Sequence, residues 1–379
     1  MASLYLHIPY CEKKCIYCDF YSIENMNSME QFLVMLEKEI GMYADRFSRS
    51  ESIETIFFGG GTPSLLPSST IGRILDALRS HYQIQPEAEI TVETNPGTVD
   101  LEKLRGYRSV GVNRLSIGIQ SFHSDELAFL SRIHTSEEAI QCVESAYRAG
   151  FENVSVDLIF SLPGQTLERW NQTLRRAIAL EPKHISAYSL IVEEHTPLFA
   201  MVQNKMVSPL PESLDAEIYE ATIAMMAHHG YQQYEISNYA KPGYECRHNK
   251  NYWNHSNYLS FGPSSHSFWK DGPTHGRRWW NLRSIAQYCE SIGRNEFPVA
   301  GSEVVAMEQM FNEAIFLGLR TGELNVAMLQ QLYGVDMLTT HGEKLQSFSD
   351  DNLLRIKNRR ITLTRKGFLV CDAIAESLL

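Results

Sequence analysis

Three cysteines stand within eight residues near the start of the chain, as Cys11, Cys15 and Cys18. Thiolates at spacings of four and three can converge on one metal object from a single loop, and iron–sulfur clusters are held by such closely spaced cysteines. A [4Fe–4S] cube takes four ligands, so this loop would leave one iron open to a cofactor or substrate. Zinc is the alternative, with His7 as a fourth ligand, but this spacing is unusual for zinc.

A glycine run follows the second apolar segment of the chain, as Gly59-Gly60-Gly61 before Thr62. Glycine has no Cβ, so the backbone there can approach a ligand closely and can take positive φ angles. The run therefore favours a loop whose N–H groups meet a bound molecule. A tight turn between a strand and a helix would produce the same pattern.

Polar side chains stand at or just after the ends of three predicted strands, as Glu93, Gln120 and Asp157. The carboxyl ends of parallel strands carry the functional residues of α/β barrels. The coincidence at three strand ends favours a binding site over three unrelated surface or capping groups.

The elements that would position these residues are short apolar segments that alternate with amphipathic helices. Strands are expected at residues 4–8, 53–58, 89–92, 112–119, 153–160 and 185–191. Helices are expected at 29–47, 69–82, 136–149 and 167–180, with Ser69 as the N-cap of the second. Alternating strands and helices predict a parallel sheet, either open and doubly wound or closed into a partial barrel.

The later part of the chain has a different pattern. Pro209 and Pro211 precede a predicted helix at 212–230, and a polar, aromatic-rich stretch covers 234–281. The tail, from about residue 302, predicts two or three helices, a hairpin at 352–363 and a final helix. We therefore expect three parts: a core at 1–200, a connecting segment at 201–300, and a small winged-helix-like domain at 301–379.

Composition narrows the function classes. The 379 residues are 44% hydrophobic and 21% charged, which is ordinary for a globular protein, and the net charge of −11 repels nucleic acid. No run of ~18 apolar residues predicts a membrane span, and the N-terminus does not resemble a signal peptide. A cytoplasmic location is expected, where cysteines stay reduced or bind metals.

The C-x3-C-x2-C spacing resembles the signature of the radical-SAM superfamily, which uses S-adenosylmethionine (SAM). The flanking sequence is similar to the branch that contains oxygen-independent coproporphyrinogen III dehydrogenase and its haem-chaperone relative. The matching segments are 5–11, 19–20, 59–63, 93–96, 114–122 and 157–164. The resemblance implies an α/β fold: a partial (β/α)6 TIM-like radical-SAM barrel with a smaller C-terminal mixed α+β, winged-helix-like domain.

The resemblance also implies roles for individual residues. Cys11, Cys15 and Cys18 would hold the [4Fe–4S] cluster, whose open iron would bind the amino and carboxylate groups of SAM. The positions that match SAM-contacting residues of the family are Tyr5, Tyr17, Gly60, Gly61, Thr62, Glu93, Gln120, Arg132 and Asp157.

Two features favour the haem-chaperone branch over the dehydrogenase. The dehydrogenase has a further cysteine two residues after the third ligand, where this chain has Phe20. The chaperone branch carries an H-N-x-x-Y-W motif, which matches His248, Asn249, Tyr252 and Trp253. A neutral imidazole can ligate haem iron, and the aromatic rings can pack on a porphyrin. The motif alone is weak, because a histidine among aromatic residues is more often an ordinary core or surface residue.

Three functions follow as hypotheses. The first is a carrier that binds haem as cargo and passes it to acceptor proteins, with membrane respiratory enzymes as candidate acceptors at the inner membrane face. The second is radical oxidative decarboxylation of coproporphyrinogen III, so whether the chain is an enzyme stays open. The third is action on nucleic acid, suggested by the basic residues of 355–366; a solvated hairpin is favoured instead, and no nucleic acid is expected. A homodimer on ligand loading is implied by the resemblance alone.

Overall fold

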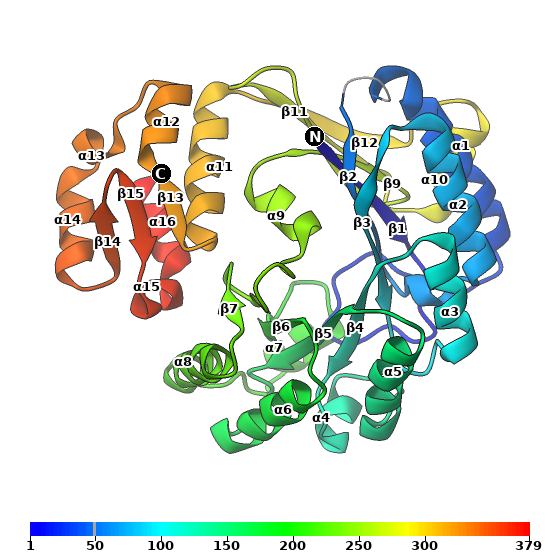
Figure 1. Ribbon diagram of the computed structural model, residues 1–379, viewed down its shortest axis with the longest axis horizontal. Coiled ribbons are helices and arrows are strands. Elements are labelled where there is room, and N and C mark those ends of the chain that lie inside the picture. The colour runs from blue at the N-terminus through cyan, green and yellow to red at the C-terminus, as the bar shows by residue number, and fades with distance from the viewer. Residues whose placement is uncertain (48–50) are drawn as a thin grey trace.

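The computed structural model describes residues 1–47 and 51–379. Its first half consists of six parallel strands in series, with a helix or helices after each of the first five (Figure 1). The strands are β1 (Ala2–Ile8), β2 (Ile53–Gly60), β3 (Ile84–Thr94), β4 (Arg114–Gln120), β5 (Asn153–Phe160) and β6 (His184–Ser189). The helices are α1 (Met29–Phe47), α2 (Ser68–His81), α3 (Leu101–Val110), α4 (Ser124–Phe129), α5 (Ser136–Arg148) and α6 (Leu167–Ala179), with a short 3-10 turn η1 (Pro63–Leu65).

The order of the strands decides between the two expected architectures. Strands β1 to β6 lie side by side in chain order, and each neighbouring pair is parallel. A doubly wound sheet would reverse its order at a switch point. Right-handed crossovers that never reverse place the helices on one face and curve the sheet around the other. The partial barrel is confirmed, and its sheet is open rather than closed.

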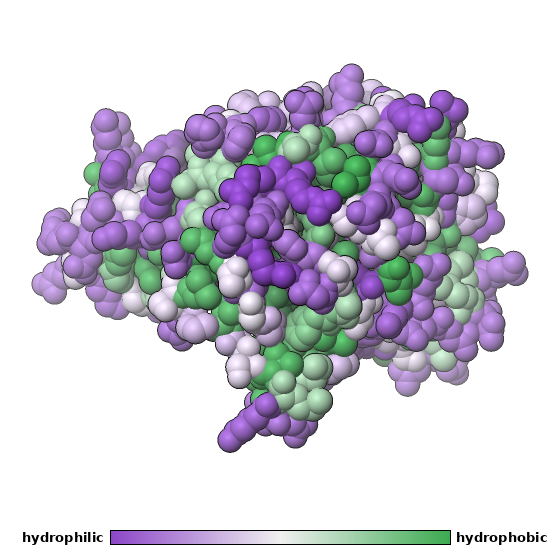
Figure 2. All heavy atoms as spheres, turned by 90° about the horizontal axis from the view of Figure 1, so that it is seen from below, coloured by the Kyte–Doolittle hydropathy of each residue, from purple (hydrophilic) through white to green (hydrophobic). Residues whose placement is uncertain are grey.

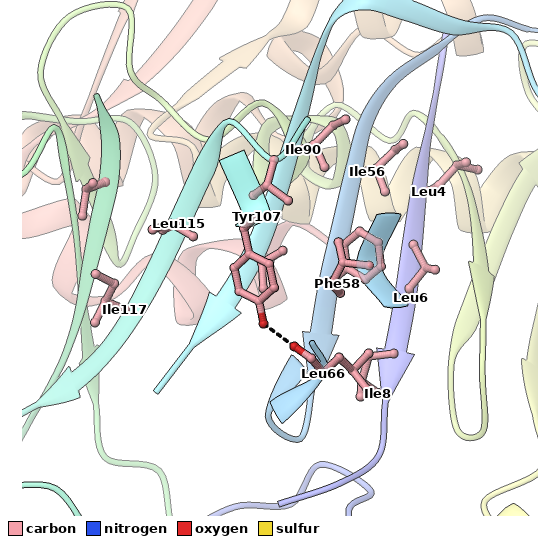
Figure 3. Close-up of a cluster of buried hydrophobic side chains, with 14 of the residues drawn as sticks. Leu4, Leu6, Ile8, Ile56, Phe58, Leu66, Ile90, Tyr107, Leu115 and Ile117 are labelled. Atoms are coloured by element: carbon pink, nitrogen blue, oxygen red, sulfur yellow. Dashed lines mark hydrogen bonds between the residues drawn. The ribbon is translucent and has the colours of Figure 1, made fainter. Parts of the chain in front are cut away.

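The two faces of this curved sheet differ in polarity. Side chains alternate along a strand, and the outward set is apolar and packs beneath the helices, as Leu4, Leu6, Ile56 and Phe58 do in Figure 3. In the same cluster the buried Tyr107 hydroxyl of α3 donates to the Leu66 carbonyl at 2.6 Å. The inward set is polar, and its members include Tyr5, His7, Thr55, Glu93, Arg114, Ser116, Asp157 and His184.

Local capping fixes several helices where the sequence places them. Thr135 and Glu138 form a capping box at α5, and Asp100 and Thr166 accept backbone N–H bonds at the starts of α3 and α6. The expected N-cap at Ser69 is wrong. Helix α2 begins at Ser68, after Pro67, whose fixed φ suits a helix start, so Ser69 lies within the first turn.

The segment 201–300, expected as a connection, extends the sheet at both ends. Strands β8 and β7 follow β6, and strands β9 to β12 follow β1, so the sheet has twelve strands in all. The elements are α7 (Pro197–Gln203), α8 (Glu212–His228), β7 (Gln232–Gln233), β8 (Asn238–Ala240), α9 (Arg247–Trp253), β9 (Asn257–Phe261), β10 (His266–Lys270), β11 (Gly276–Asn281), α10 (Ile285–Gly293) and β12 (Val299–Val305).

The last part of the chain has its own core and a second sheet, in the order β13-β15-β14. Its hairpin matches the one expected at 352–363. The elements are α11 (Met307–Arg320), β13 (Glu323–Asn325), α12 (Val326–Tyr333), α13 (Met337–Thr340), α14 (Gly342–Asp350), β14 (Leu354–Lys357), β15 (Arg360–Leu363), α15 (Arg365–Leu369) and α16 (Cys371–Leu378). In the part of the chain that the structure describes, no helix is long and apolar enough to span a bilayer.

Candidate functional site at the mouth of the barrel

The three clustered cysteines lie in the loop that leaves the carboxyl end of β1. Backbone bonds hold this loop: the Cys11 N–H donates to the Ile23 carbonyl (3.0 Å), and the Ile23 N–H donates to the Pro9 carbonyl (2.8 Å). Cys11 is buried, whereas Cys15 and Cys18 are partly exposed, and all three are free thiols. The loop is thus fixed at its base and open at its tip.

The residues around the three sulfurs suit a metal group that is bound by thiolates. Iron–sulfur clusters are held by cysteine thiolates. Within residues 1–47 and 51–379, no group of three His, Cys, Asp or Glu side chains is arranged to hold a single metal ion. Two neighbours donate to the sulfurs: the Thr62 hydroxyl to Cys11 Sγ (3.5 Å) and Arg132 Nη1 to Cys15 Sγ (3.7 Å). Hydrogen bonds to sulfur are among the features that tune such clusters.

The glycine run is tied directly to the cysteine loop. The Gly61 N–H donates to the Ile8 carbonyl (2.8 Å), and the Thr62 N–H donates to the Tyr10 carbonyl (2.7 Å). A Cβ on Gly61 would lie 2.6 Å from the Tyr10 carbonyl oxygen, and Gly60 has a φ of 107°. A side chain at position 61 would therefore displace the cysteine loop, and one at position 60 would be strained and would meet the His7 ring at 2.7 Å. The run therefore sets the position of the loop, whatever else it binds.

Two carboxyl groups lie on the inner face of the barrel, close enough for Asp157 to affect Glu93 electrostatically. Glu93 Oε2 accepts the Gly60 N–H at 3.2 Å, and Asp157 accepts the Ser116 hydroxyl at 2.8 Å. Burial, and then the nearby Asp157, raises the pKa of Glu93 to about 8. Burial also raises the pKa of Asp157, although its serine partners oppose the change. Buried carboxyls with raised pKa values are typical of functional sites.

Gln120 and Arg132 frame the far side of the mouth. Gln120 ends β4 with a positive φ of 67°, and Arg132 Nη2 donates to Asn95 Oδ1 (2.6 Å) and to the Gly118 carbonyl (2.7 Å). Asn95 in turn donates to the Thr62 hydroxyl at 3.0 Å. These contacts connect the ends of β2, β3 and β4 to the cysteine loop in one network.

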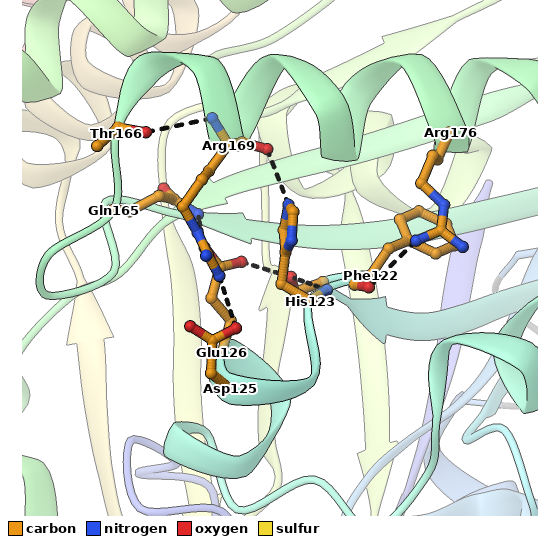
Figure 4. A network of polar contacts seen from close by, with 9 residues as sticks. Phe122, His123, Asp125, Glu126, Gln165, Thr166, Arg169 and Arg176 are labelled. Carbon is orange, nitrogen blue, oxygen red and sulfur yellow. Dashed lines mark hydrogen bonds and ion pairs between the residues drawn. The ribbon is translucent and has the colours of Figure 1, made fainter.

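A second polar network holds the segment between β4 and α4 (Figure 4). The buried Glu126 accepts from Arg169 Nε at 3.1 Å and from Gln165 Nε2 at 3.2 Å, and His123 Nε2 donates to the Arg169 carbonyl at 3.2 Å. The Arg132 N–H also donates to the Leu127 carbonyl of α4. Helix α6 thereby fixes α4, and α4 fixes the segment that carries Arg132.

The two tyrosines expected beside the cofactor take different positions. Tyr5 lies on the inner face of β1, where its hydroxyl donates to His7 Nδ1 at 3.2 Å. Tyr17 lies in the cysteine loop and packs on Leu130, Ile159 and Leu162. Burial raises the pKa of both phenols, so both are neutral. Tyr5 therefore forms the inner wall, and Tyr17 joins the loop to β5.

Two residues at this site were not predicted as part of the SAM site: Asn95 was not singled out, and His7 was considered only as a zinc ligand. His7 Nε2 donates to the Tyr21 carbonyl at 2.8 Å, so its Nδ1 must accept from Tyr5, and burial lowers its pKa to about 4. Asn95 connects Thr62 to Arg132, as described above. Each stands two residues after a predicted site residue, Tyr5 or Glu93, and the two-residue period of a strand would have identified both.

The motif expected to bind haem lies inside the barrel, on helix α9 (Figure 1). His248 is 2% exposed, and its ring nitrogens bond to the Thr55 hydroxyl (2.7 Å) and the Tyr252 hydroxyl (3.1 Å). Its ring stacks on Phe57 of β2 with centroids 4.9 Å apart. Burial lowers its pKa to about 3, so the imidazole is neutral.

The remaining motif residues have different surroundings. Tyr252, which bonds His248, meets Tyr258 of β9 edge to face at 4.7 Å, and the Trp253 ring lies 5.8 Å from the Arg320 guanidinium carbon of α11. Asn249 is partly exposed. His248 and Tyr252 are thus linked within the barrel, and Trp253 contacts the first helix of the C-terminal part.

Several exposed apolar side chains lie between β1 and α1, between α4 and α5, after β6, and after α7. Phe20 is 67% exposed, Ile133 58%, Ile191 66% and Met206 71%. Figure 2, seen from below Figure 1, shows green apolar patches among purple polar groups on the face toward which α4 and α6 lie.

The basic residues of the C-terminal hairpin are partly paired. Arg359 forms an ion pair with Asp336 (2.9 Å), and Arg360 forms one with Glu323. Pairing reduces the charge that these arginines could offer to a phosphate backbone.

Two segments of the chain match known protein families. Residues 5–177 match the radical SAM superfamily model, and residues 306–370 match the HemN C-terminal domain model. The chain superposes on coproporphyrinogen III oxidase (HemN) from Escherichia coli with a TM-score of 0.85 and 25% identity, covering 100% of this chain and 89% of that one. The open barrel with a cysteine loop at its mouth therefore defines a radical-SAM protein. Membership of this class implies a [4Fe–4S] cluster and SAM.

Two curated relatives narrow the class further. "Heme chaperone HemW" of Bacillus subtilis is 34% identical over 383 residues, covering 100% of this chain and 99% of the relative. The protein of the same name from Escherichia coli K12 is 40% identical over 270 residues, covering 70% and 69%. The chain belongs to the HemW family.

Proposed function

We propose that this chain is a haem chaperone, which binds haem and transfers it to acceptor proteins on a radical-SAM scaffold. The relatives named for this function align with the whole chain. The observation that carries the proposal is Phe20, an exposed side chain two residues after Cys18, where the dehydrogenase branch has a further cysteine.

In this proposal Cys11, Cys15 and Cys18 are the three ligands of the cluster. The cluster and SAM, when bound, supply one-electron chemistry. Thr62 and Arg132 donate to the cysteine sulfurs and stabilise their charged forms. Tyr5, Tyr17, Gly60, Gly61, Thr62, Glu93, Gln120, Arg132 and Asp157 form the SAM site.

We further propose that His248 ligates haem iron, with Asn249, Tyr252 and Trp253 beside it. The low pKa keeps the imidazole neutral, which a ligand to iron requires. The ring must exchange a hydrogen bond for the metal, because both nitrogens have partners in the fold described above. Ligation by His248 therefore needs a change at α9.

The test is an anaerobic haem titration of the cluster-reconstituted protein, read from the Soret band. His248→Gln keeps hydrogen-bonding groups but removes the imidazole. His184→Gln is its matched control, since His184 is equally buried and bonds Ser155 and Tyr234, both at 2.8 Å. We expect one saturable haem per chain in the parent and the control, and none in His248→Gln. Equal binding in all three would show that His248 is not the ligand.

The alternative is oxidative decarboxylation of coproporphyrinogen III, which is favoured by the match to the HemN structure along the whole chain. An anaerobic assay with SAM, a reductant and coproporphyrinogen III tests it. Protoporphyrinogen formation would favour the enzyme, and its absence in a preparation with full cluster content would exclude it.

The wider proposal concerns location and partners. Residues 1–200 would hold the cofactors, 201–300 would carry the haem motif, and 301–379 would cover it from one side. The chaperone would act in the cytoplasm, with transient contact at the inner membrane face to load respiratory enzymes. A homodimer on ligand loading is part of the proposal, and no nucleic acid is.

A further inference from the structure

Helix α9 is held inside the barrel by polar contacts from three strands. Glu89 of β3 accepts the backbone N–H groups of Arg247 (3.2 Å) and His248 (3.1 Å). Thr55 of β2 bonds the His248 ring, and Asn251 Nδ2 donates to the Ser3 hydroxyl of β1 at 2.8 Å. The helix therefore occupies the inner space of the sheet as a plug, and every one of these bonds would be lost if it left.

The same helix supports the wall of the proposed SAM site. The His248 ring lies 6.4 Å from the Tyr5 ring and stacks on Phe57, which in turn lies 6.2 Å from Tyr5. Tyr5 bonds His7, and His7 bonds the cysteine loop at Tyr21. A Cβ on Gly59 would lie within 2.9 Å of Tyr5 and 3.2 Å of Glu93, so the wall has no spare room.

Haem cannot reach His248 in this arrangement. Iron ligation takes the lone pair of one ring nitrogen, and both nitrogens already have partners. The ring is also enclosed by Phe57 and Tyr5, with no space for a porphyrin plane beside it. The state that binds haem must therefore withdraw His248 from the barrel, and with it the packing behind Tyr5.

We propose that haem and SAM bind antagonistically, because α9 within the barrel completes the SAM site and α9 withdrawn from it exposes the haem ligand. This inference rests on the proposed function and adds its regulation. SAM occupancy would hold the chain closed to haem, and haem loading would weaken SAM binding. By thermodynamic linkage, each ligand must change the affinity of the other by the same factor.

The first experiment needs no variant. Haem is titrated into anaerobic, cluster-reconstituted protein with and without saturating SAM, and SAM is titrated with and without haem; reductant is omitted so that SAM is not cleaved. We expect each ligand to weaken the other by about fivefold or more, with equal factors in the two directions. Equal haem affinity with and without SAM would overturn the inference and leave the haem-chaperone proposal standing. Absence of any saturable haem site would overturn both.

A matched pair of variants tests the plug itself. Thr55→Val removes the hydroxyl that holds His248 Nδ1. Thr91→Val removes another buried hydroxyl, on the neighbouring strand, that has no hydrogen-bond partner. We expect Thr55→Val to tighten haem binding by about fivefold or more, because the closed state is weakened, and Thr91→Val to leave it within about twofold. Circular dichroism melts establish that both variants fold. Unchanged or weaker haem binding in folded Thr55→Val would exclude the plug.

Discussion

The cysteine loop and helix α9 present their functional groups in opposite ways. The loop is fixed by backbone bonds to the glycine run, and its sulfurs lie near an open mouth with donors already in place. The motif on α9 is buried, and the polar atoms of its histidine are already used. One region is organised before any ligand arrives, whereas the other must give up internal bonds to act.

This difference follows from the chemistry of the two ligands. A cluster and SAM gain from a rigid, prearranged site, because ordering is then paid during folding rather than on binding. Cargo must be released as well as bound. When the ligating side chain is also held by bonds within the protein, only the fraction of molecules in the open state can bind, and the apparent affinity for the cargo falls by that fraction. The burial of His248, the proposed haem ligand, therefore suits a carrier better than an enzyme that keeps its cofactor.

The largest expected effect is the loss of the cluster from the cysteine loop. Cys15→Ser should reduce the iron content of reconstituted protein from about four atoms per chain to near zero, because serine does not replace a thiolate ligand. Iron and sulfide analysis measures this. Cys371→Ser, a buried cysteine of α16 in the core of the C-terminal part, is the control and should keep its cluster. Cluster retention in Cys15→Ser would remove that residue from the ligand set.

Gly61→Ala should have the second largest effect. The new Cβ would lie 2.6 Å from the Tyr10 carbonyl oxygen and 2.9 Å from that of Ile8. We expect a loss of about 1–3 kcal/mol in unfolding free energy and reduced cluster incorporation, because the cysteine loop must shift. Denaturant melts and iron analysis measure the two effects. Gly272→Ala has nothing within 4 Å of the new Cβ and should be neutral. Equal behaviour of the two variants would contradict the close approach.

The cysteine loop and the strand ends around it were largely predictable from the sequence, whereas the position of α9 inside the barrel was not. Cysteine spacing, the glycine run and polar residues at strand ends are local signals, and a parallel sheet brings strand ends together by construction. His7 and Asn95 could also have been predicted, because each stands two residues after a predicted site residue and side chains two apart on a strand share a face. The strands were expected, and the order that makes them a barrel agrees with the family resemblance.

The position of α9 depends on contacts between residues far apart in the chain. Thr55 and His248 are separated by 193 residues, and neither carries a local sign of the other. Thr55, Glu89 and Arg114 each resemble ordinary strand residues in sequence, and they form one polar interior only after the sheet curves. A motif search therefore finds His248 but not the hydrogen bonds that its two ring nitrogens make.

The stability of the protein should depend on pH in opposite directions through Glu93, at the cysteine-loop site, and through His248, on α9. Burial raises the pKa of Glu93 from 4.5 to about 8, so the stability linked to its protonated form is lost as pH rises through that interval. Burial lowers the pKa of His248 from 6.5 to about 3, so stability linked to its neutral form is lost as pH falls through that interval.

Two variants sharpen this contrast in cluster-free protein, measured by denaturant melts across pH. The two intervals overlap between pH 4.5 and 6.5, so the comparison uses the limbs outside the overlap. Glu93→Gln should flatten the upper limb, from about pH 6.5 to 8, and His248→Gln should flatten the lower limb, from about pH 4.5 to 3, each by up to about 1.4 kcal/mol per pH unit. Each variant serves as the control for the other, because neither should change the opposite limb. Parallel shifts of both limbs in either variant would show that other groups set the profile.

The smallest expected effect concerns Arg277 and Arg278 of β11, whose guanidinium groups are of the kind that pairs with carboxylates such as haem propionates. Arg277 is exposed and pairs with Asp271 (2.9 Å), so Arg277→Ala should change stability by no more than about 0.5 kcal/mol and leave haem affinity within about twofold. Arg278 joins β11 to Glu313 of α11 at 2.6 Å and is only 25% exposed, so Arg278→Ala should cost about 1–2 kcal/mol. Melts and Soret titrations measure both. A marked loss of haem affinity in Arg277→Ala alone would move the cargo site from α9 to the outer strands, and the buried His248 would then be a structural residue of the barrel.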